Sequence, residues 1–203
     1  MGIAEEKRDL RASVRRKLEA VTAEEAARSG AEIGEKILSS ALWKNARSVF
    51  LYVSMGKEPE TRRLIGSALS EGKAVYVPKC LRAKDGTPAM LAVRIRSLAD
   101  LVPGLFSIPE PAFDPVNPPE TADPCAIDLA LVPCVTVTRK GERLGHGGGY
   151  YDRFLAAGRK PVTLCLCFEA LLSDSVPTEP HDVPADYLAT EEGIFSCKTG
   201  SRV

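Results

Sequence analysis

Short apolar runs alternate with helix-like segments along most of the chain, and this alternation constrains the fold more than any other feature. Runs of this kind are rich in β-branched and aliphatic residues, as buried strands are. They are SVFLYVS (48–54), AVYVP (74–78), MLAVRI (90–95), IDLALVP (127–133) and PVTLCLCF (161–168). Since some of them are apolar on both faces, the sequence predicts an α/β fold with a mostly parallel sheet covered on two sides.

Two helices are expected before the first strand. Apolar residues at helical spacing predict the first, and they are Ile3, Leu10, Val14, Leu18 and Val21. The segment TAEE (22–25) has the pattern of a capping box, so a second helix should begin near residue 23 and run to about residue 41.

Further elements are expected later in the chain. Helices should span residues 60–71 and 150–157, and residues 187–192 could add a last edge strand. The proline-rich stretch from Pro103 to Pro124 is expected to be an ordered loop. With 203 residues the chain suits one domain over 1–203, in which the helices of residues 1–41 pack on the α/β core.

Charge and composition exclude some classes of partner. Lysine plus arginine and aspartate plus glutamate number 27 each, and aromatic residues make up 6%. No overall positive field therefore favours nucleic acid or a membrane surface. The sequence shows no signal peptide and no apolar spanning segment, and we expect a cytoplasmic protein.

The six cysteines do not form a metal-binding pattern. None belongs to a CxxC pair, and the chain has only two histidines. A zinc site would need ligands gathered from distant positions. Cys165 and Cys167 lie in an apolar run, where cysteine behaves as a small core residue. We expect reduced, buried thiols.

The segment RLGHGGGYYDR (143–153) is the most unusual stretch of the chain. Glycines directly before a helix expose backbone N–H groups and are typical of anion sites. Arg143 and Arg153 could add charge-assisted hydrogen bonds, and Asp152 could cap the helix or hold a cation. Neither the Walker pattern nor the dinucleotide fingerprint fits the segment. A tight connection without a ligand remains the alternative.

Two charged features lie far from this segment in sequence. On a helical wheel at about 100° per residue, Lys7 falls inside the apolar stripe and Arg11 lies at its edge. Either both side chains snorkel past the core edge or the helix directs them at a bound polyphosphate. Asp182 and Asp186 precede the last expected strand. They are either solvated loop carboxylates or, in the case of Asp186, a partner of Asp152 at a Mg²⁺ site.

Together these segments resemble the 5-formyltetrahydrofolate cyclo-ligase family, also called methenyltetrahydrofolate synthetases. The resemblance covers nearly the whole chain in order, and its R-L-G-x-G-x-G-Y-Y-D block is highly specific. The matching segments are Lys7 with Arg11, SMGKEPET (54–61), FSIPEP (106–111), DLALVPCVTVTRKGERLGHGGGYYDRFL (128–155) and PHDVPADYLATE (180–191).

The resemblance implies an ATP- and Mg²⁺-dependent conversion of 5-formyltetrahydrofolate to 5,10-methenyltetrahydrofolate, with release of ADP and phosphate. ATP would phosphorylate the formyl oxygen, and N10 of the folate would then attack the formyl carbon. Catalysis would consist mostly of positioning and charge neutralisation. The resemblance also implies a monomer with a three-layer α/β/α fold similar to ribose-phosphate isomerases and CoA-transferases.

The resemblance implies roles for individual residues, by matching motif positions. Catalytic roles fall to Arg143, His146 and Tyr151, and the metal to Asp152 and Asp186. ATP would be bound by Lys7, Arg11, Arg143, Leu144, Gly145, His146, Gly147, Gly148, Gly149, Tyr150 and Tyr151. The folate, with or without additional glutamates, would be bound by Val53, Glu58, Phe106, His146, Gly147, Gly148, Gly149 and Tyr150.

Two positions depart from other family members. His146 stands where arginine or tyrosine is common, and Gly148 where some members have lysine, so one phosphate-binding cation is absent here. His146 is not assigned as a general base, because the mechanism needs no strong one.

Three other function classes remain as alternatives. A phosphosugar-binding regulator or isomerase would keep the glycine-rich anion site without ATP. An inactive cyclo-ligase-like binding module would be expected to lack part of a set of motif residues that are all present here, namely Lys7, Arg11, Glu58, Arg143, Asp152 and Asp186. Nucleic-acid binding has little support from the balanced charge.

Overall fold

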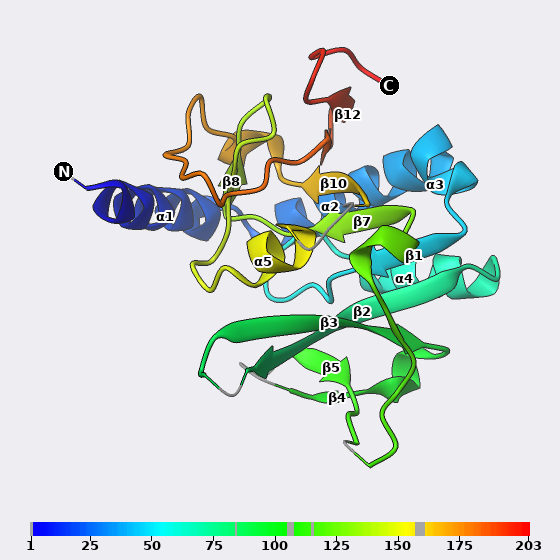
Figure 1. Ribbon diagram of the computed structural model, residues 1–203. Coiled ribbons are helices and arrows are strands. Elements are labelled where there is room, and N and C mark those ends of the chain that lie inside the picture. The colour runs from blue at the N-terminus through cyan, green and yellow to red at the C-terminus, as the bar shows by residue number, and fades with distance from the viewer. Residues whose placement is uncertain (1, 84, 105–107, 115, 157–160) are drawn as a thin grey trace.

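The computed structural model describes residues 2–83, 85–104, 108–114, 116–156 and 161–203. Its centre is an eight-stranded sheet with the order β12-β11-β10-β7-β1-β2-β3-β6 (Figure 1). The strands are β1 (Ser48–Leu51), β2 (Ala74–Arg82), β3 (Pro88–Ile95), β6 (Thr121–Ala122), β7 (Leu129–Val132), β10 (Val162–Leu166), β11 (Tyr187–Thr190) and β12 (Gly193–Ser196).

The middle of this sheet is parallel and its margins are antiparallel. Strands β11, β10, β7, β1 and β2 pair in parallel, whereas β12, β3 and β6 pair antiparallel with their neighbours. The central strands β1 and β7 are almost entirely buried, as expected for strands covered on both faces. The mostly parallel α/β sheet predicted from the alternation is therefore confirmed.

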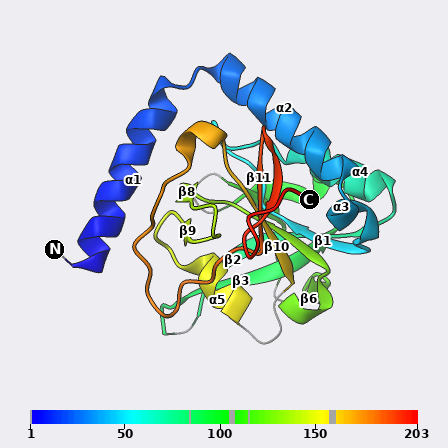
Figure 2. The same cartoon turned by 90° about the horizontal axis from the view of Figure 1, so that it is seen from above.

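Helices lie on both faces of the sheet. On one side α2 (Ala23–Ser39) contacts β11 and β12, and α4 (Arg62–Ser70) contacts β2. On the other side α5 (Tyr150–Ala156) contacts β3, and its Phe154 stacks on Phe50 of β1 with ring centroids 4.9 Å apart. Figure 2 shows α5 across the sheet from α2 and α4. The three layers meet in one hydrophobic core.

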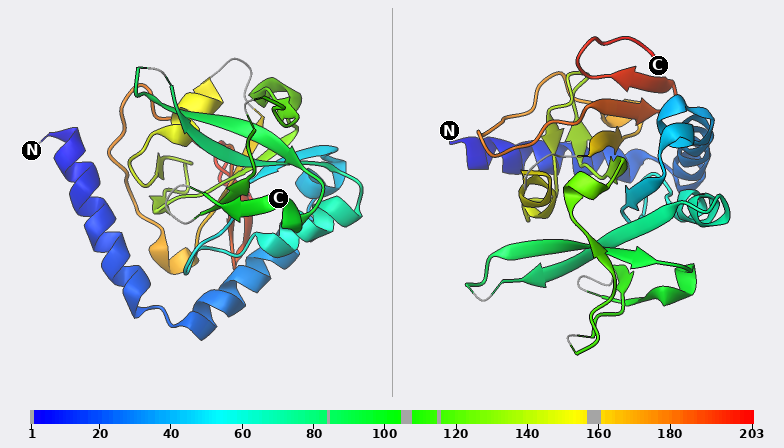
Figure 3. Two further views of the ribbon diagram at one scale, coloured as in Figure 1. Left: turned by 90° about the horizontal axis from the view of Figure 1, so that it is seen from below. Right: turned by 45° about the vertical axis from the view of Figure 1, so that its right-hand side comes forward.

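Helix α1 (Ile3–Ala20) is attached to this body only lightly. It runs along one side of the molecule (Figures 2 and 3). Only Lys7 and Val14 are buried, and Ile3 is 41% exposed. The apolar stripe predicted from sequence therefore packs in its middle but not at its start. No helix in the described ranges has both the length and the apolar character needed to cross a membrane.

Some predicted boundaries were wrong. The second helix does not reach residue 41, because the hydroxyl of Ser40 accepts a hydrogen bond from the N–H of Trp43 and starts a separate helix, α3 (Ala41–Asn45). Strand β11 is not the edge strand, because β12 pairs with it through a tight connection. The predicted capping box is present, with the hydroxyl of Thr22 accepting from the N–H of Glu25.

The stretch from Pro103 to Pro124 is not merely a loop. It contributes β5 (Pro109–Pro111), which pairs with β4 (Leu101–Pro103), and it also contains β6. A further hairpin, β8 (Thr136–Val137) and β9 (Arg143–Leu144), was not predicted. Strands of two or three residues are too short to leave a periodic pattern in the sequence.

Trp43 of α3 provides a test of how much the packing of this short helix stabilises the fold. Its side chain is 1% exposed, and the indole N–H donates to the carboxylate of Glu71 at 3.1 Å. Trp43→Ala is expected to lower the free energy of unfolding by about 3–5 kcal/mol. Urea unfolding followed by circular dichroism measures this, with Trp43→Phe expected to cost less. A loss under 1 kcal/mol for the alanine variant would contradict the packing described here.

Candidate active site

A groove separates α1 from the body of the protein and contains a cavity of about 140 Å³. One wall is α1, which contributes Arg11, Arg15 and Leu18 among others. The opposite wall consists of residues 57–59, residues 134–135, His146 and the segment from Leu166 to Leu171. These segments follow the carboxyl ends of β1, β7 and β10, where open α/β sheets bind their ligands.

The glycine segment lies at this groove and contacts α1. The Nε of Arg11 donates to the carbonyl oxygen of Gly145 at 2.8 Å. Gly147 and Gly149 have φ of 102° and 66°, where side chains are strained. A Cβ added at Gly149 would lie 2.8 Å from Nη1 of Arg153. Arg11 therefore lies against the glycine segment, and glycine is required by the backbone at positions 147 and 149.

The remaining members of the segment have distinct places. Leu144 is buried in β9 and Tyr150 is half-buried at the start of α5. Arg153 does not face the groove as a free cation, because its Nε donates to the carbonyl of Pro88 at 2.8 Å and its Nη2 donates to that of Gly148. These two bonds hold the guanidinium of Arg153 against the glycine segment.

Arg143 is the most deeply buried cation of the site. Its side chain is 2% exposed, and its Nη2 donates to Oδ1 of Asp152 at 2.7 Å. Nη1 donates to the carbonyl of Pro133, just beyond the end of β7, at 3.4 Å. Within the described ranges Nε of Arg143 has no hydrogen-bond partner. Buried polar atoms are nearly always satisfied, so Nε is an exception, and an anion could reach it only if the side chains around it move.

Lys7 is held in an ion-pair cluster on the other side of the glycine segment. Its ammonium lies 2.6 Å from Asp182 and 2.9 Å from Glu179. Burial by itself lowers the pKa of Lys7, but the hydrogen bonds and charges of Asp182 and Glu179 outweigh it and raise the pKa above 10.5. Although burial raises the pKa of Asp182, the bonds from Lys7 and from the N–H of Glu179 lower it below 3.8 overall.

This pair predicts a pH dependence of stability with a definite sign. The lowered pKa of Asp182 means that its contribution is present above pH 3.8 and is lost as the pH falls through the folded-state value. The raised pKa of Lys7 means that its contribution is lost only as the pH rises beyond 10.5. We expect the free energy of unfolding to fall less steeply below about pH 4 in Asp182→Asn than in the wild type. Chemical unfolding at several pH values gives this slope for each protein. Equal slopes of unfolding free energy against pH in the two proteins would refute the pairing of Asp182 with Lys7.

Glu58 and His146 contact each other on the same wall of the groove. Nε2 of His146 lies 3.3 Å from Oε1 of Glu58, and Oε2 of Glu58 accepts a hydrogen bond from the N–H of Met55 at 2.9 Å. The second bond fixes the carboxylate, while the side chain of His146 is 64% exposed. Glu58 thus presents an acceptor to the groove, as an N–H-rich ring would require.

Tyr151 lies behind the glycine segment. Its ring centroid is 5.9 Å from the guanidinium carbon of Arg143 and 6.3 Å from the ring of Phe50. Burial raises the pKa of its phenol, so the hydroxyl stays protonated and can act only as a hydrogen-bond partner near neutral pH. Val53 is buried in the core, and Phe106 lies outside the described residues.

Comparison with known proteins decides the family. The model of the 5-formyltetrahydrofolate cyclo-ligase family matches residues 3–191. The chain belongs to this family. A relative named 5-formyltetrahydrofolate cyclo-ligase from Mycolicibacterium smegmatis is 34% identical over 177 residues, covering 86% of this chain and 89% of the relative. The mouse protein of the same name is 27% identical over 195 residues, covering 94% of this chain and 96% of that protein.

A solved structure agrees with this membership. The 5,10-methenyltetrahydrofolate synthetase of Aquifex aeolicus superposes with a TM-score of 0.80 at 27% identity, covering 97% of this chain and 95% of the other. The similarity extends over the whole sheet and its helices, so the three-layer arrangement is that of the cyclo-ligase family.

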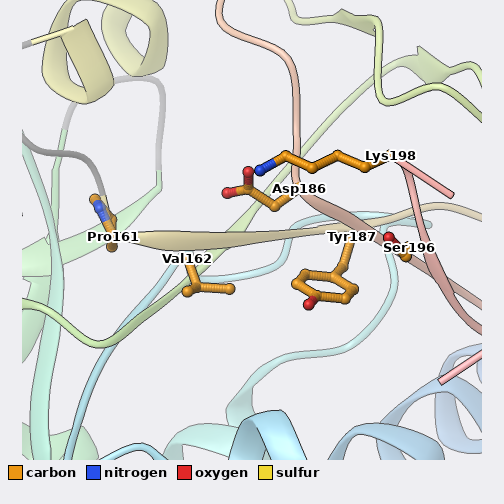
Figure 4. A pocket seen from close by; sticks show the side chains of 6 residues that line it. All are labelled: Pro161, Val162, Asp186, Tyr187, Ser196 and Lys198. Atoms are coloured by element: carbon orange, nitrogen blue, oxygen red, sulfur yellow. The ribbon is translucent and has the colours of Figure 1, made fainter.

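The carboxylates expected to share a metal do not have the same surroundings. Asp152 accepts hydrogen bonds from Arg143 and from the N–H of Val183, the latter at 3.2 Å. Asp186 instead accepts from the N–H and hydroxyl of Thr163, at 3.0 and 2.9 Å, near the amino end of β10. It lines a separate cavity of about 260 Å³, in which its carboxylate points toward Lys198 (Figure 4).

Asp182, rather than Asp186, is linked to both Lys7 and Asp152. It directly precedes Val183, whose N–H bonds to Asp152, and it holds Lys7. Among the described residues no group of three or more histidine, cysteine, aspartate or glutamate side chains is arranged to hold a metal by itself. A Mg²⁺ ion here would therefore need ligands from a bound phosphate, which is how Mg²⁺ is usually held in nucleotide sites.

The six cysteines are free thiols, as predicted, but only Cys165, Cys167 and Cys197 are buried, and Cys125 is exposed. Cys134 and Cys167 line the groove, which the sequence did not indicate. Sequence reasoning also gave no role to Glu179, Arg15 or Lys57. The signal for Glu179 was present in the buried position of Lys7 on the helical wheel, since a buried ammonium requires an acidic partner.

Proposed function

We propose that this protein catalyses the ATP- and Mg²⁺-dependent cyclisation of 5-formyltetrahydrofolate to 5,10-methenyltetrahydrofolate, with release of ADP and phosphate. The observation that supports it most is the buried guanidinium of Arg143, which has an unpartnered Nε beside the glycine segment. A family of enzymes that transfer phosphate to a formyl oxygen needs a cation where charge develops.

The reaction can be balanced in two steps. The formyl oxygen attacks the γ-phosphorus, an O–P bond forms, and the bond to the β-phosphate oxygen breaks to release ADP. N10 then attacks the formyl carbon, the C–O bond breaks with phosphate as the leaving group, and N10 loses its proton. Phosphorylation is needed because an amide oxygen is a poor leaving group.

We propose that the ion pairs of the site are rearranged when MgATP binds. Lys7, Arg11 and Arg143 would turn toward the phosphates, which are stronger acceptors than a single carboxylate. Asp152 and Asp182 would then be free to hold Mg²⁺, which neutralises phosphate charge when bound. The number of charges fits this exchange, because one Mg²⁺ carries two positive charges and Asp152 and Asp182 carry one negative charge each.

The folate is assigned to the opposite wall of the groove. Glu58 would accept hydrogen bonds from the N–H groups of the pterin, and His146 would contact either the formyl group or a phosphate. Tyr151 would donate through its protonated hydroxyl. Roles for Val53 and Phe106 in lining the folate pocket rest on the family resemblance alone.

An isotope experiment tests the proposed chemistry. The substrate is 5-formyltetrahydrofolate labelled with ¹⁸O in the formyl group, and mass spectrometry follows the released phosphate. One ¹⁸O atom per phosphate is expected, because the formyl oxygen leaves on phosphorus. Unlabelled phosphate formed together with the methenyl product would rule out this route.

We further propose that the enzyme is a cytoplasmic monomer. The lightly attached α1 completes the groove from within one chain, so no second subunit is needed for the site. Light scattering at micromolar concentration should give a mass near 21.8 kDa.

A further inference from the structure

We propose that Lys57 is a positioning residue that fixes the end of α1 to the loop carrying Glu58, and so holds the two walls of the groove together. The inference rests on the proposed function, because it concerns the walls of that same site. It assigns a role to a side chain that touches α1 and not the reacting groups.

The contacts of Lys57 are directed at the carboxyl end of α1. Its ammonium donates to the carbonyl oxygens of Leu18, Glu19 and Val21, at 3.2, 3.2 and 2.5 Å. The last carbonyls of a helix lack partners within the helix and carry its negative dipole end. A lysine from elsewhere in the chain therefore satisfies them with both hydrogen bonds and charge.

The loop that supplies Lys57 is itself firmly held. The hydroxyl of Tyr52 donates to the carbonyl of Pro59 at 2.9 Å in a buried position. Ser54 and Thr61 exchange hydrogen bonds across the base of the loop, and the hydroxyl of Thr61 donates to the carbonyl of Tyr52 at 2.6 Å. Because the loop is held in this way, the bonds from Lys57 can fix the position of α1 relative to Glu58 on the opposite wall.

Apart from the apolar packing of Leu18 and Val21 and the connection to α2, few contacts hold this end of α1. Lys7 is tied to Asp182 and Glu179 near the start of the helix, and Arg11 is tied to Gly145 in its middle. Beyond Arg11 only Val14 is buried, while Leu18 is half-buried at the groove. The three bonds from Lys57 are thus the main polar attachment of the last turn among the described residues.

Losing this attachment should affect both substrates at once. Arg11 and Arg15 on α1 and Glu58 beside Lys57 line the same groove. If the last turn moves away, the cations for the nucleotide and the carboxylate for the folate lose their common spacing. We expect KM for ATP and KM for 5-formyltetrahydrofolate each to rise roughly tenfold in Lys57→Met, with kcat changed about threefold or less.

The experiment compares Lys57→Met with Lys57→Arg, which keeps the donors, and with Lys44→Met, which removes an exposed lysine of α3. Both KM values are measured, and hydrogen exchange of peptides covering residues 10–21 is followed in the protein without ligands. Lys57→Met should raise both KM values and speed hydrogen exchange of the α1 peptides. In Lys57→Arg both KM values and the exchange rates should return most of the way to those of the wild type. Lys44→Met should match the wild type in both measurements.

Two outcomes would overturn the proposal. Unchanged exchange in Lys57→Met would show that Lys57 does not hold α1. Faster exchange with both KM values unchanged would show a structural contact without a positioning role. If the wild type has no cyclo-ligase activity, the proposed function fails separately, and the same exchange comparison still decides whether Lys57 fixes the helix.

Discussion

Replacing Arg143 with methionine is expected to lower kcat/KM for 5-formyltetrahydrofolate by about 10²–10³-fold, the effect of removing one preorganised donor from a site of charge development. Arg143 is 2% exposed at its side chain, is oriented by Asp152 and Pro133, and has a buried Nε without a hydrogen-bond partner among the described residues. Water cannot easily replace a buried guanidinium, so neither substrate nor solvent compensates for its loss.

The same substitution is expected to affect stability, and this effect must be separated from catalysis. Removing one partner of a buried ion pair leaves the other uncompensated, which costs about 3–5 kcal/mol. Circular dichroism at the assay temperature therefore accompanies the kinetics. Arg139→Met is a matched control, because Arg139 lies on the same hairpin but pairs with Glu169 near the surface. Activity of folded Arg143→Met within threefold of the wild type would contradict the assignment.

The second large effect on activity is expected from replacing the carboxylates of Asp152 and Asp182. Asp152→Asn and Asp182→Asn should each lower activity by about 10²-fold or more and raise the Mg²⁺ concentration that gives half-maximal rate. Asparagine keeps the size of the side chain but removes the charge that would hold a cation. Initial rates measured over a Mg²⁺ titration at saturating ATP give both quantities.

Asp186→Asn is the control for this pair. Its carboxylate bonds to Thr163 at a different end of the central strands, so its activity and Mg²⁺ requirement should remain close to those of the wild type. The opposite pattern, with Asp186→Asn inactive and Asp182→Asn normal, would favour the pairing of Asp152 with Asp186 that the family resemblance implied.

The central sheet could be predicted because each of its strands is indicated by residues that are adjacent in the sequence. Each central strand carries its own apolar run, and each covering helix carries its own periodic pattern, so alternation alone gives a parallel sheet with two covered faces. The hairpin of β8 and β9 could not be predicted in this way, because two-residue strands have no period. The position of β12 at the edge of the sheet depends on its pairing with β11, and the residues of β12 do not by themselves indicate that pairing.

The candidate site could be predicted only where its residues are neighbours in sequence. The glycines, Arg143 and Asp152 lie within one segment, and their proximity follows from it. The partners of Lys7 lie 172 and 175 positions away, so the helical wheel shows that Lys7 is unusual but not what it contacts. Asp182 and Asp186 lie in the same loop, and only the folded chain shows that Asp182 pairs with Lys7 whereas Asp186 bonds to Thr163.

The most direct test of the proposed activity follows the near-ultraviolet absorbance of the methenyl product with purified protein and 5-formyltetrahydrofolate. One sample contains MgATP, a second contains ATP with EDTA, and a third contains MgATP with Arg143→Met. An absorbance rise with wild type and MgATP, and little or none in the other two, is the expected result. No rise from folded wild type with fresh substrate, or an equal rise in EDTA, would contradict an ATP- and Mg²⁺-dependent cyclisation at this site.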